Sequence, residues 1–143
     1  MTREYTNRKI VLNRRPQGDL RDGDLSMLSE PVRELSQGEF LLKTIWLSLD
    51  PYMRPRMSDI KNYLQPIGIG KVIVGETVSV VIESKSEKYK QGDCVTCFSG
   101  WQEYFLAHES MENIYHIDDQ GLPLSVFLGS AGMTGRTAYS GLT

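Results

Sequence analysis

The side chains best suited to chemistry lie together at residues 49–57, in the sequence LDPYMRPRM. An apolar run ends at Pro51, and proline cannot occupy a central position in a β-sheet. We therefore expect Tyr52, Met53 and Arg54 to be displayed where a strand ends. A tyrosine hydroxyl can donate a proton or a hydrogen bond to a substrate oxygen, and methionine adapts to apolar ligands. Alternatively, Tyr52 packs half-buried at a rim and Arg54 pairs with an acid. The residues alone favour this second interpretation.

Two cysteines, Cys94 and Cys97, form the sequence CVTC, which is compatible with a redox dithiol or with half of a zinc site. Residues 93–98 read as a strand, whereas a redox pair normally begins a helix and a structural zinc ion needs four ligands. The histidines, His108 and His116, lie in separate strand-like runs, and their spacing shows no acid–base partner. We interpret all four side chains as structural and expect no metal site.

Two glycine clusters resemble phosphate loops at first sight. Gly68 and Gly70 precede a strand, but a dinucleotide fingerprint needs its glycines between a strand and a helix. Gly129, Gly132 and Gly135 do precede a helical run, but their spacing is GxxGxxG instead of GxGxxG. Neither cluster is expected to bind a nucleotide by itself.

The rest of the sequence predicts a mainly β fold. Short apolar runs separated by glycine turns are typical of a barrel or a sandwich. After residue 118 the pattern changes: Pro123 can open a short helix that ends at Gly129, and a second helix begins near Thr137. Residues 58–64 are either one helical turn or a loop. The expected strands are residues 8–12, 40–49, 72–83, 93–98, 103–107 and 113–117.

Composition narrows the class of protein. The chain has 143 residues, 40% of them hydrophobic, and a formal charge of −2, which suits one domain with one core. No strongly basic surface for nucleic acid or anionic lipid is indicated. No apolar run approaches the length of a bilayer span or of a signal peptide. We expect a soluble, cytoplasmic protein with neither a nucleic-acid nor a membrane partner.

Five segments occur in a characteristic order along the chain: LSLDPYMRPRM, GxGxV leading into VVIES, QGDCV, SGW and LPLSVFLGSAGMTGRTAY. Together they resemble the zinc-independent medium-chain reductases. More narrowly, the chain is similar to the branch with prostaglandin reductases (leukotriene B4 12-hydroxydehydrogenases), bacterial curcumin reductases and plant alkenal double-bond reductases. The likeness runs from about Arg8 to Thr143, and the family usually has proline where Thr134 stands, within a turn.

The resemblance implies a domain arrangement. Residues 1–123 would be the N-terminal portion of a GroES-like, partly open barrel, which is the catalytic, substrate-binding domain of the family. Residues 124–143 would be connecting helices that lead into a Rossmann cofactor domain absent from this chain. We therefore expect the front portion of a larger two-domain oxidoreductase, in which Leu124, Phe127 and Leu128 lack part of their packing surface.

The resemblance also implies a reaction. Members of the family transfer hydride from NADPH to the β-carbon of an α,β-unsaturated ketone or aldehyde, and a hydrogen-bond donor stabilises the enolate before its α-carbon is protonated. Their zinc-dependent relatives hold a metal through cysteine and histidine after the corresponding strand and in a glycine-histidine-glutamate segment. Here those positions are Leu-Asp-Pro and Gly75-Glu76, so no catalytic zinc is expected.

Carried over by position, the resemblance assigns roles to three residues. Tyr52 matches a tyrosine near the nicotinamide and substrate and is expected to be catalytic. Together with Met53 and Arg54, which are displayed at the same strand end, it forms the predicted substrate-binding set. Met133 and Thr137 match positions at the nicotinamide end of the cleft, while the absent domain would bind most of the NADPH.

The partner implied by the resemblance is a small hydrophobic enone or alkenal, and homo-oligomerisation is left open. Two rival hypotheses are a stand-alone GroES-like binding module without enzyme activity and an NADPH:quinone reductase of the same superfamily.

Overall fold

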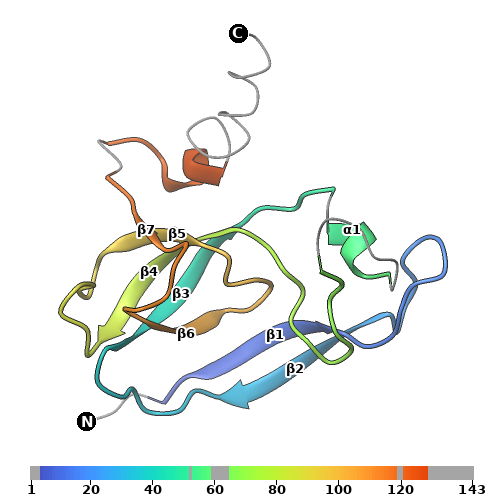
Figure 1. Ribbon diagram of the computed structural model, residues 1–143, viewed down its shortest axis with the longest axis horizontal. Coiled ribbons are helices and arrows are strands. Elements are labelled where there is room, and N and C mark those ends of the chain that lie inside the picture. The colour runs from blue at the N-terminus through green and yellow to red at the C-terminus, as the bar shows by residue number, and fades with distance from the viewer. Residues whose placement is uncertain (1–3, 52, 59–64, 119–120, 129–143) are drawn as a thin grey trace, which may run out of the picture.

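The computed structural model describes residues 4–51, 53–58, 65–118 and 121–128. The described chain is built mainly from β-strands, as the sequence predicted, with two short helices (Figure 1). The elements follow one another as β1 (Thr6–Leu12), β2 (Leu25–Pro31), β3 (Glu39–Leu47), α1 (Met53–Arg56), β4 (Thr77–Ser84), β5 (Cys94–Cys97), β6 (Tyr104–His108), β7 (Tyr115–His116) and the 3-10 helix η1 (Leu124–Leu128).

The strands form two antiparallel sheets. β1 and β2 pair with each other, and the second sheet has the order β6-β3-β4-β5-β7. β3 lies inside this sheet, where Phe40 is paired with Ala107 of β6 and Ser84 of β4. Its pairing with β4 shifts register twice, the second time between Thr44 and Trp46. Such irregularities bend a strand, which helps a sheet to curl into a barrel.

Main-chain hydrogen bonds from β1 close one side of the barrel. The amide of Ile10 donates to the carbonyl of Trp101 (2.8 Å), and the amide of Ile73 donates to the carbonyl of Ile10 (3.0 Å). The other side is open, with a groove of about 650 Å³ between the end of β2 and the ends of β3 and β4. The barrel is therefore partly open, as expected.

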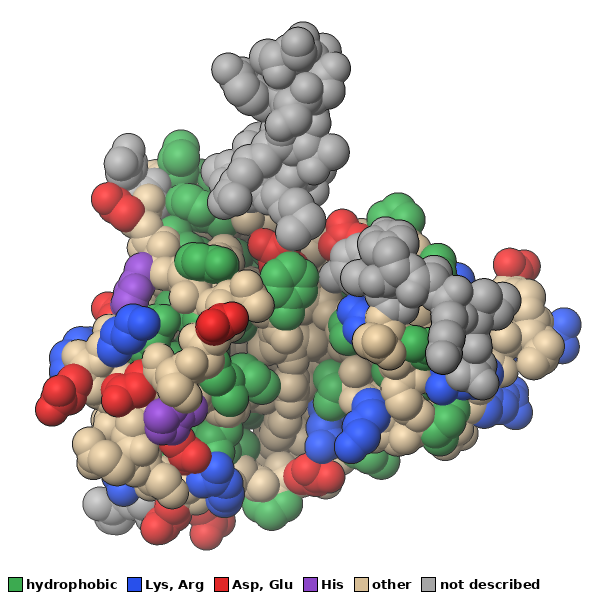
Figure 2. All heavy atoms as spheres, viewed as in Figure 1, with side chains coloured by type: hydrophobic (Ala, Val, Ile, Leu, Met, Phe, Trp, Pro, Cys, Tyr) green, Lys and Arg blue, Asp and Glu red, His purple; other side chains and the backbone are tan. Residues whose placement is uncertain are grey.

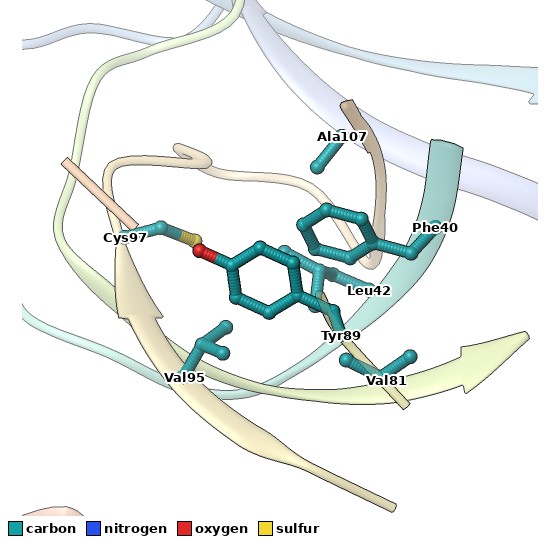
Figure 3. Packing of buried hydrophobic residues seen from close by; sticks show 7 residues of the cluster. All are labelled: Phe40, Leu42, Val81, Tyr89, Val95, Cys97 and Ala107. Atoms are coloured by element: carbon teal, nitrogen blue, oxygen red, sulfur yellow. The ribbon is translucent and has the colours of Figure 1, made fainter. Parts of the chain in front are cut away.

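The larger apolar core lies against the five-stranded sheet (Figure 3). Phe40 is fully buried, and its ring stacks on Tyr89 at 4.3 Å between centroids. The other face of Tyr89 stacks on His116 at 4.6 Å. Burial, and then the nearby Cys97 thiol, raise the pKa of the Tyr89 hydroxyl, which donates to the carbonyl of Ile114 at 3.2 Å. This stack fastens the loop after β4 to the sheet.

The structure differs from the predicted strands in two places. β2 was not predicted, because its sequence LSMLSEP is largely exposed and gains its order from main-chain pairing with β1. The predicted strand at residues 72–83 is shorter, since regular pairing begins only at Thr77. Ahead of it, Val72 makes a single bridge to Val11. Gly75 lies outside the regular strands, where its carbonyl accepts from the amide of Gly100 at 3.1 Å.

The helices differ in part from the predictions. η1 confirms a short helix ahead of Gly129, and it packs against β3 and β4. Leu124, Phe127 and Leu128 are half-buried there, so part of their surface is uncovered within the described chain. α1 was not predicted and lies before the segment 58–64, of which only residue 58 is described. The helix expected from Thr137 lies outside the described residues.

An exposed charge cluster marks the start of β3 and predicts a pH dependence. Arg33 donates to both Glu39 carboxylate oxygens (2.7 and 2.9 Å), and the amide of Ser36 adds a third hydrogen bond. The Arg33 guanidinium, and then the Ser36 amide, lower the pKa of Glu39 to about 2. A carboxyl group whose pKa falls on folding stabilises the protein above its unfolded pKa and loses this contribution as the pH drops through the folded pKa. Glu39→Gln should therefore lower the melting temperature at neutral pH.

Melting curves of both proteins between neutral pH and pH ~2 test this expectation. The difference between wild type and Glu39→Gln should shrink over the lower part of that range. In an Arg33→Met background, the same substitution should change the melting temperature much less. A difference that stays constant down to acid pH would contradict the assignment.

Candidate functional site

The candidate site lies where β3 leaves the sheet and α1 begins. Pro51 cannot continue a ladder and holds the preceding residue extended, so the chain turns there, and the amide of Met53 donates to the carbonyl of Asp50 at 3.2 Å. Met53 and Met57 are spaced by four residues, which places them on one helical face, and both are buried. Between them, Arg54 is half-buried on another face of this short element.

Gly75 lies where the end of β3, the start of α1 and Trp101 come close together. A Cβ atom there would lie 2.7 Å from Cδ1 of Leu47, 3.1 Å from Cε of Met53 and 3.3 Å from Cδ1 of Trp101. The close approach, not a left-handed conformation, accounts for the glycine. The result is an apolar wall formed by the end of β3, the start of α1 and the Trp101 indole.

Trp101 is held rigidly in that wall. Its amide donates to the carbonyl of Ile73 (2.9 Å), and its carbonyl accepts from Ile10 (2.8 Å). The ring packs on the second core cluster, which includes Met57 and Ile73, so the packing role predicted for Trp101 is confirmed. Within the described part of the chain, its buried indole nitrogen finds no hydrogen-bond acceptor.

Arg54 points its guanidinium at the loop after β1. Nη2 donates to the carbonyls of Gly18 (2.5 Å) and Pro16 (3.4 Å), Nε donates to Gly18 (3.2 Å), and Nη1 donates to the Ser58 hydroxyl (3.0 Å). These partners are carbonyl and hydroxyl oxygens, not the acid that the sequence led us to consider. A contact between Arg54 and substrate stays a prediction.

A buried hydroxyl cluster behind the wall escaped sequence reasoning. Thr77 is fully buried, and its Oγ1 lies 2.6 Å from the Ser99 hydroxyl, 3.2 Å from the Cys97 carbonyl and 3.4 Å from the Ser79 hydroxyl. Burying a hydroxyl is costly unless it is hydrogen-bonded, so these groups satisfy one another. They tie the start of β4 to the end of β5.

The cysteines and histidines have structural contacts. Cys94 and Cys97 lie in β5, as predicted, and are not joined in a disulfide. His108 Nδ1 lies 2.8 Å from the Ser110 hydroxyl. Nε2 of His116 lies 3.4 Å from Oδ2 of Asp93. The spacing of the two residues in the sequence had not revealed this acidic neighbour. Among the described residues, no group of three or more histidine, cysteine, aspartate or glutamate side chains could hold a metal ion.

Of the five predicted site residues, the structure places two. Met53 and Arg54 are neighbours in α1, whereas Tyr52, Met133 and Thr137 lie outside the described residues.

The described residues also lack a cradle for a dinucleotide. Gly68 and Gly70 lie in a turn that leads to a β-bridge instead of a helix, and Gly70 has a φ of +81°. The helices in this part of the chain have four and five residues, too short for the helix that cradles a pyrophosphate.

Two surface properties bear on partners. Positively and negatively charged side chains are interspersed over the face shown in Figure 2, and apolar side chains reach the surface between them. Within the described ranges, no helix is long and apolar enough to cross a membrane.

Comparisons with known proteins agree with this architecture. Residues 8–114 match a family described as the N-terminal domain of oxidoreductase. The chain belongs to this family, and its fold class is that of the GroES-like barrel of NADP-dependent medium-chain oxidoreductases.

Two relatives that share much of its sequence are named as reductases. It is 43% identical over 136 residues to an NADPH-dependent curcumin reductase of Escherichia coli (95% of this chain, 39% of the relative). It is 32% identical over 145 residues to a 2-alkenal reductase (NADP(+)-dependent) of Nicotiana tabacum (99% and 42%).

A solved structure extends the likeness to three dimensions. CurA from Vibrio vulnificus in complex with NADPH superposes with a TM-score of 0.85 and 40% identity, over 94% of this chain and 40% of that one. The chain thus spans about 40% of the length of the relatives it matches.

Proposed function

We propose that this chain forms the substrate-side barrel of an NADPH-dependent reductase that saturates the C=C bond of α,β-unsaturated ketones or aldehydes in the cytoplasm. In this proposal residues 1–123 belong to the substrate domain and residues 124–143 lead into a cofactor domain. The observation that carries the proposal is the likeness to a curcumin reductase and a 2-alkenal reductase along nearly the whole chain. The apolar wall of Leu47, Met53 and Trp101 supports it.

The proposed chemistry rests on the resemblance to enone and alkenal reductases. NADPH, bound mainly outside this chain, would supply the hydride that adds to the β-carbon. The π electrons then move to the carbonyl oxygen, and the resulting enolate takes a proton at its α-carbon. A hydrogen-bond donor stabilises the developing charge most effectively where water is excluded. In this proposal Met53 and Trp101 exclude water, and the Tyr52 hydroxyl is one of the hydrogen-bond donors.

The decisive experiment expresses the complete reading frame that contains this chain. We expect NADPH oxidation with an α,β-unsaturated ketone and with an alkenal, and mass spectrometry of the products should show a saturated C=C bond and an intact carbonyl. A quinone should be consumed much more slowly. Preference for the quinone would support the rival reductase. No turnover with any of these compounds would favour the binding-module hypothesis and refute ours. The 143-residue chain alone should show no turnover.

Replacing the proposed donor gives a sharper prediction. Tyr52→Phe in the complete protein should lower kcat/KM for the enone by about tenfold or more, because one hydrogen bond to the enolate oxygen is lost. The KM for NADPH should hardly change. Steady-state kinetics with each substrate varied in turn would measure both constants, and unchanged kinetics would assign Tyr52 to packing.

A further inference from the structure

Two arginines link α1 to the loop after β1: one donates hydrogen bonds from the loop, and the other donates hydrogen bonds to it. Arg15, in the loop, donates from Nη1 to the carbonyls of Met57 (3.0 Å) and Ile67 (2.9 Å). Arg54, in α1, donates back to the carbonyls of Pro16 and Gly18 in that loop. Figure 1 shows α1 beside the loop between β1 and β2, where this exchange takes place.

A second pair of hydrogen bonds completes the attachment. The amide of Ile67 donates to the carbonyl of Arg56 at 2.7 Å. Arg56 Nε donates to the carbonyl of Gln65 at 2.8 Å. The chain therefore leaves α1 at Met57 and returns beside it at Ile67, and the Arg15 guanidinium bridges the two carbonyls.

Such a short helix cannot hold its own position. A helix of four residues is far below the length that is stable in water, and the carbonyls at its C-terminal end have no partners within the helix. Its place must come from contacts with the rest of the fold. A guanidinium suits this task, because its donors form a rigid planar fork and it stays charged at all relevant pH values.

The position of α1 in turn decides where Met53 lies. Met53 Cε approaches the Cβ position of Gly75, next to the ring of Trp101, with no room for an extra methyl group. A small shift of α1 therefore opens or obstructs the apolar wall.

We propose that Arg15 and Arg54 are positioning residues, which set the apolar wall of the candidate site through α1. For Arg54 this role replaces the substrate contact predicted from the sequence, because its guanidinium donors are directed to Pro16, Gly18 and Ser58. The expected effect on enone reduction rests on the reductase function proposed above. The expected effect on the position of α1 does not depend on that function.

Amide hydrogen exchange tests the structural part in the 143-residue chain. Arg15→Met removes both hydrogen bonds, which are stronger than neutral ones because their donor is charged. We expect the amides of Met53 and Ile67 to exchange about tenfold faster or more, while the amides that pair β3 with β4 keep their rates. Arg15→Lys, which retains a cation within reach, should restore most of the protection. Arg33→Met, which removes an exposed arginine from a different loop, is the matched control.

Steady-state kinetics of the complete protein test the functional part. Arg15→Met and Arg54→Met should each lower kcat/KM for an enone about tenfold, mainly through kcat, with the KM for NADPH unchanged and activity largely restored in Arg15→Lys. If Arg15→Met does not fold, Arg15→Gln carries the same test.

Unchanged exchange at Ile67 in Arg15→Met would overturn the proposal. A rise in the KM for enone alone, with normal exchange, would also overturn it and make these arginines substrate ligands. If wild type reduces no enone, the proposed function fails, and the exchange rates alone then decide whether the arginines position α1.

Discussion

Phe40→Ala is expected to destabilise the folded chain severely. Phe40 is fully buried, and its ring stacks on Tyr89 at 4.3 Å. Truncating a buried phenylalanine costs about 3–5 kcal/mol, because apolar contacts are lost and the cavity closes only in part. A domain has a total stability of about 5–15 kcal/mol. The single substitution therefore removes a large fraction of the stability of this fold.

The prediction extends beyond the direct contact. Tyr89 is stacked between Phe40 and His116, so the cavity releases one face of the ring that fastens the loop before β5. Urea denaturation monitored by circular dichroism would measure the loss. Phe98→Ala is the matched control, since that ring is 52% exposed and its removal should cost less than about 1 kcal/mol. Equal losses in the two variants would mean that the stack does not stabilise the core.

The parts of the fold that were predictable have strong local patterns. Residues 78–83 carry Val78, Val80 and Ile82 at alternate positions, and the end of β4 was placed correctly within one residue. β3 begins with the buried run Phe40, Leu41 and Leu42, and such apolar runs mark strands that are covered on both faces. Turn glycines bounded these segments, and Gly38 and Gly92 do have positive φ angles.

The elements that were missed have no such pattern. β2 is exposed and polar, so only its pairing partner reveals it. α1 contains Pro55, which discourages a helical prediction, although a proline is tolerated in the first turn of a helix. The proximity of Asp93 and His116 depends on the pairing of β5 with β7, and sequence spacing does not encode which strands pair.

The candidate site, too, was predictable only in part. Met53 and Arg54 were found because Pro51 ends a strand directly before them. The approach of Met53 to Gly75 and Trp101 was not foreseen, because it joins segments far apart in the sequence. A glycine inside an apolar strand pattern was the available signal, since it often marks a close approach of another element.

A glycine next to this wall gives the prediction with the largest expected effect on the site. Gly100 has a φ of +79°, and a Cβ atom there would lie 2.6 Å from the carbonyl oxygen of Ile73. That oxygen accepts the hydrogen bond that holds Trp101. Gly100→Ala combines about 1–2 kcal/mol of backbone strain with a main-chain clash and a lost hydrogen bond. We therefore expect a loss of about 3 kcal/mol or more.

Gly92→Ala separates the cost of backbone strain from the cost of the main-chain clash and the lost hydrogen bond. Gly92 has a φ of +95°, but a Cβ atom there would have no neighbour within 4 Å. Its replacement should cost only the backbone strain, about 1–2 kcal/mol. Urea denaturation would give both free energies of unfolding, and tryptophan fluorescence in a Trp46→Phe background would report on Trp101 alone. Gly100→Ala should shift this emission in the folded state, whereas Gly92→Ala should not. Equal stability losses and an unshifted emission would show that the Ile73 carbonyl yields to the added methyl group, so that Gly100 is needed only for its backbone angle.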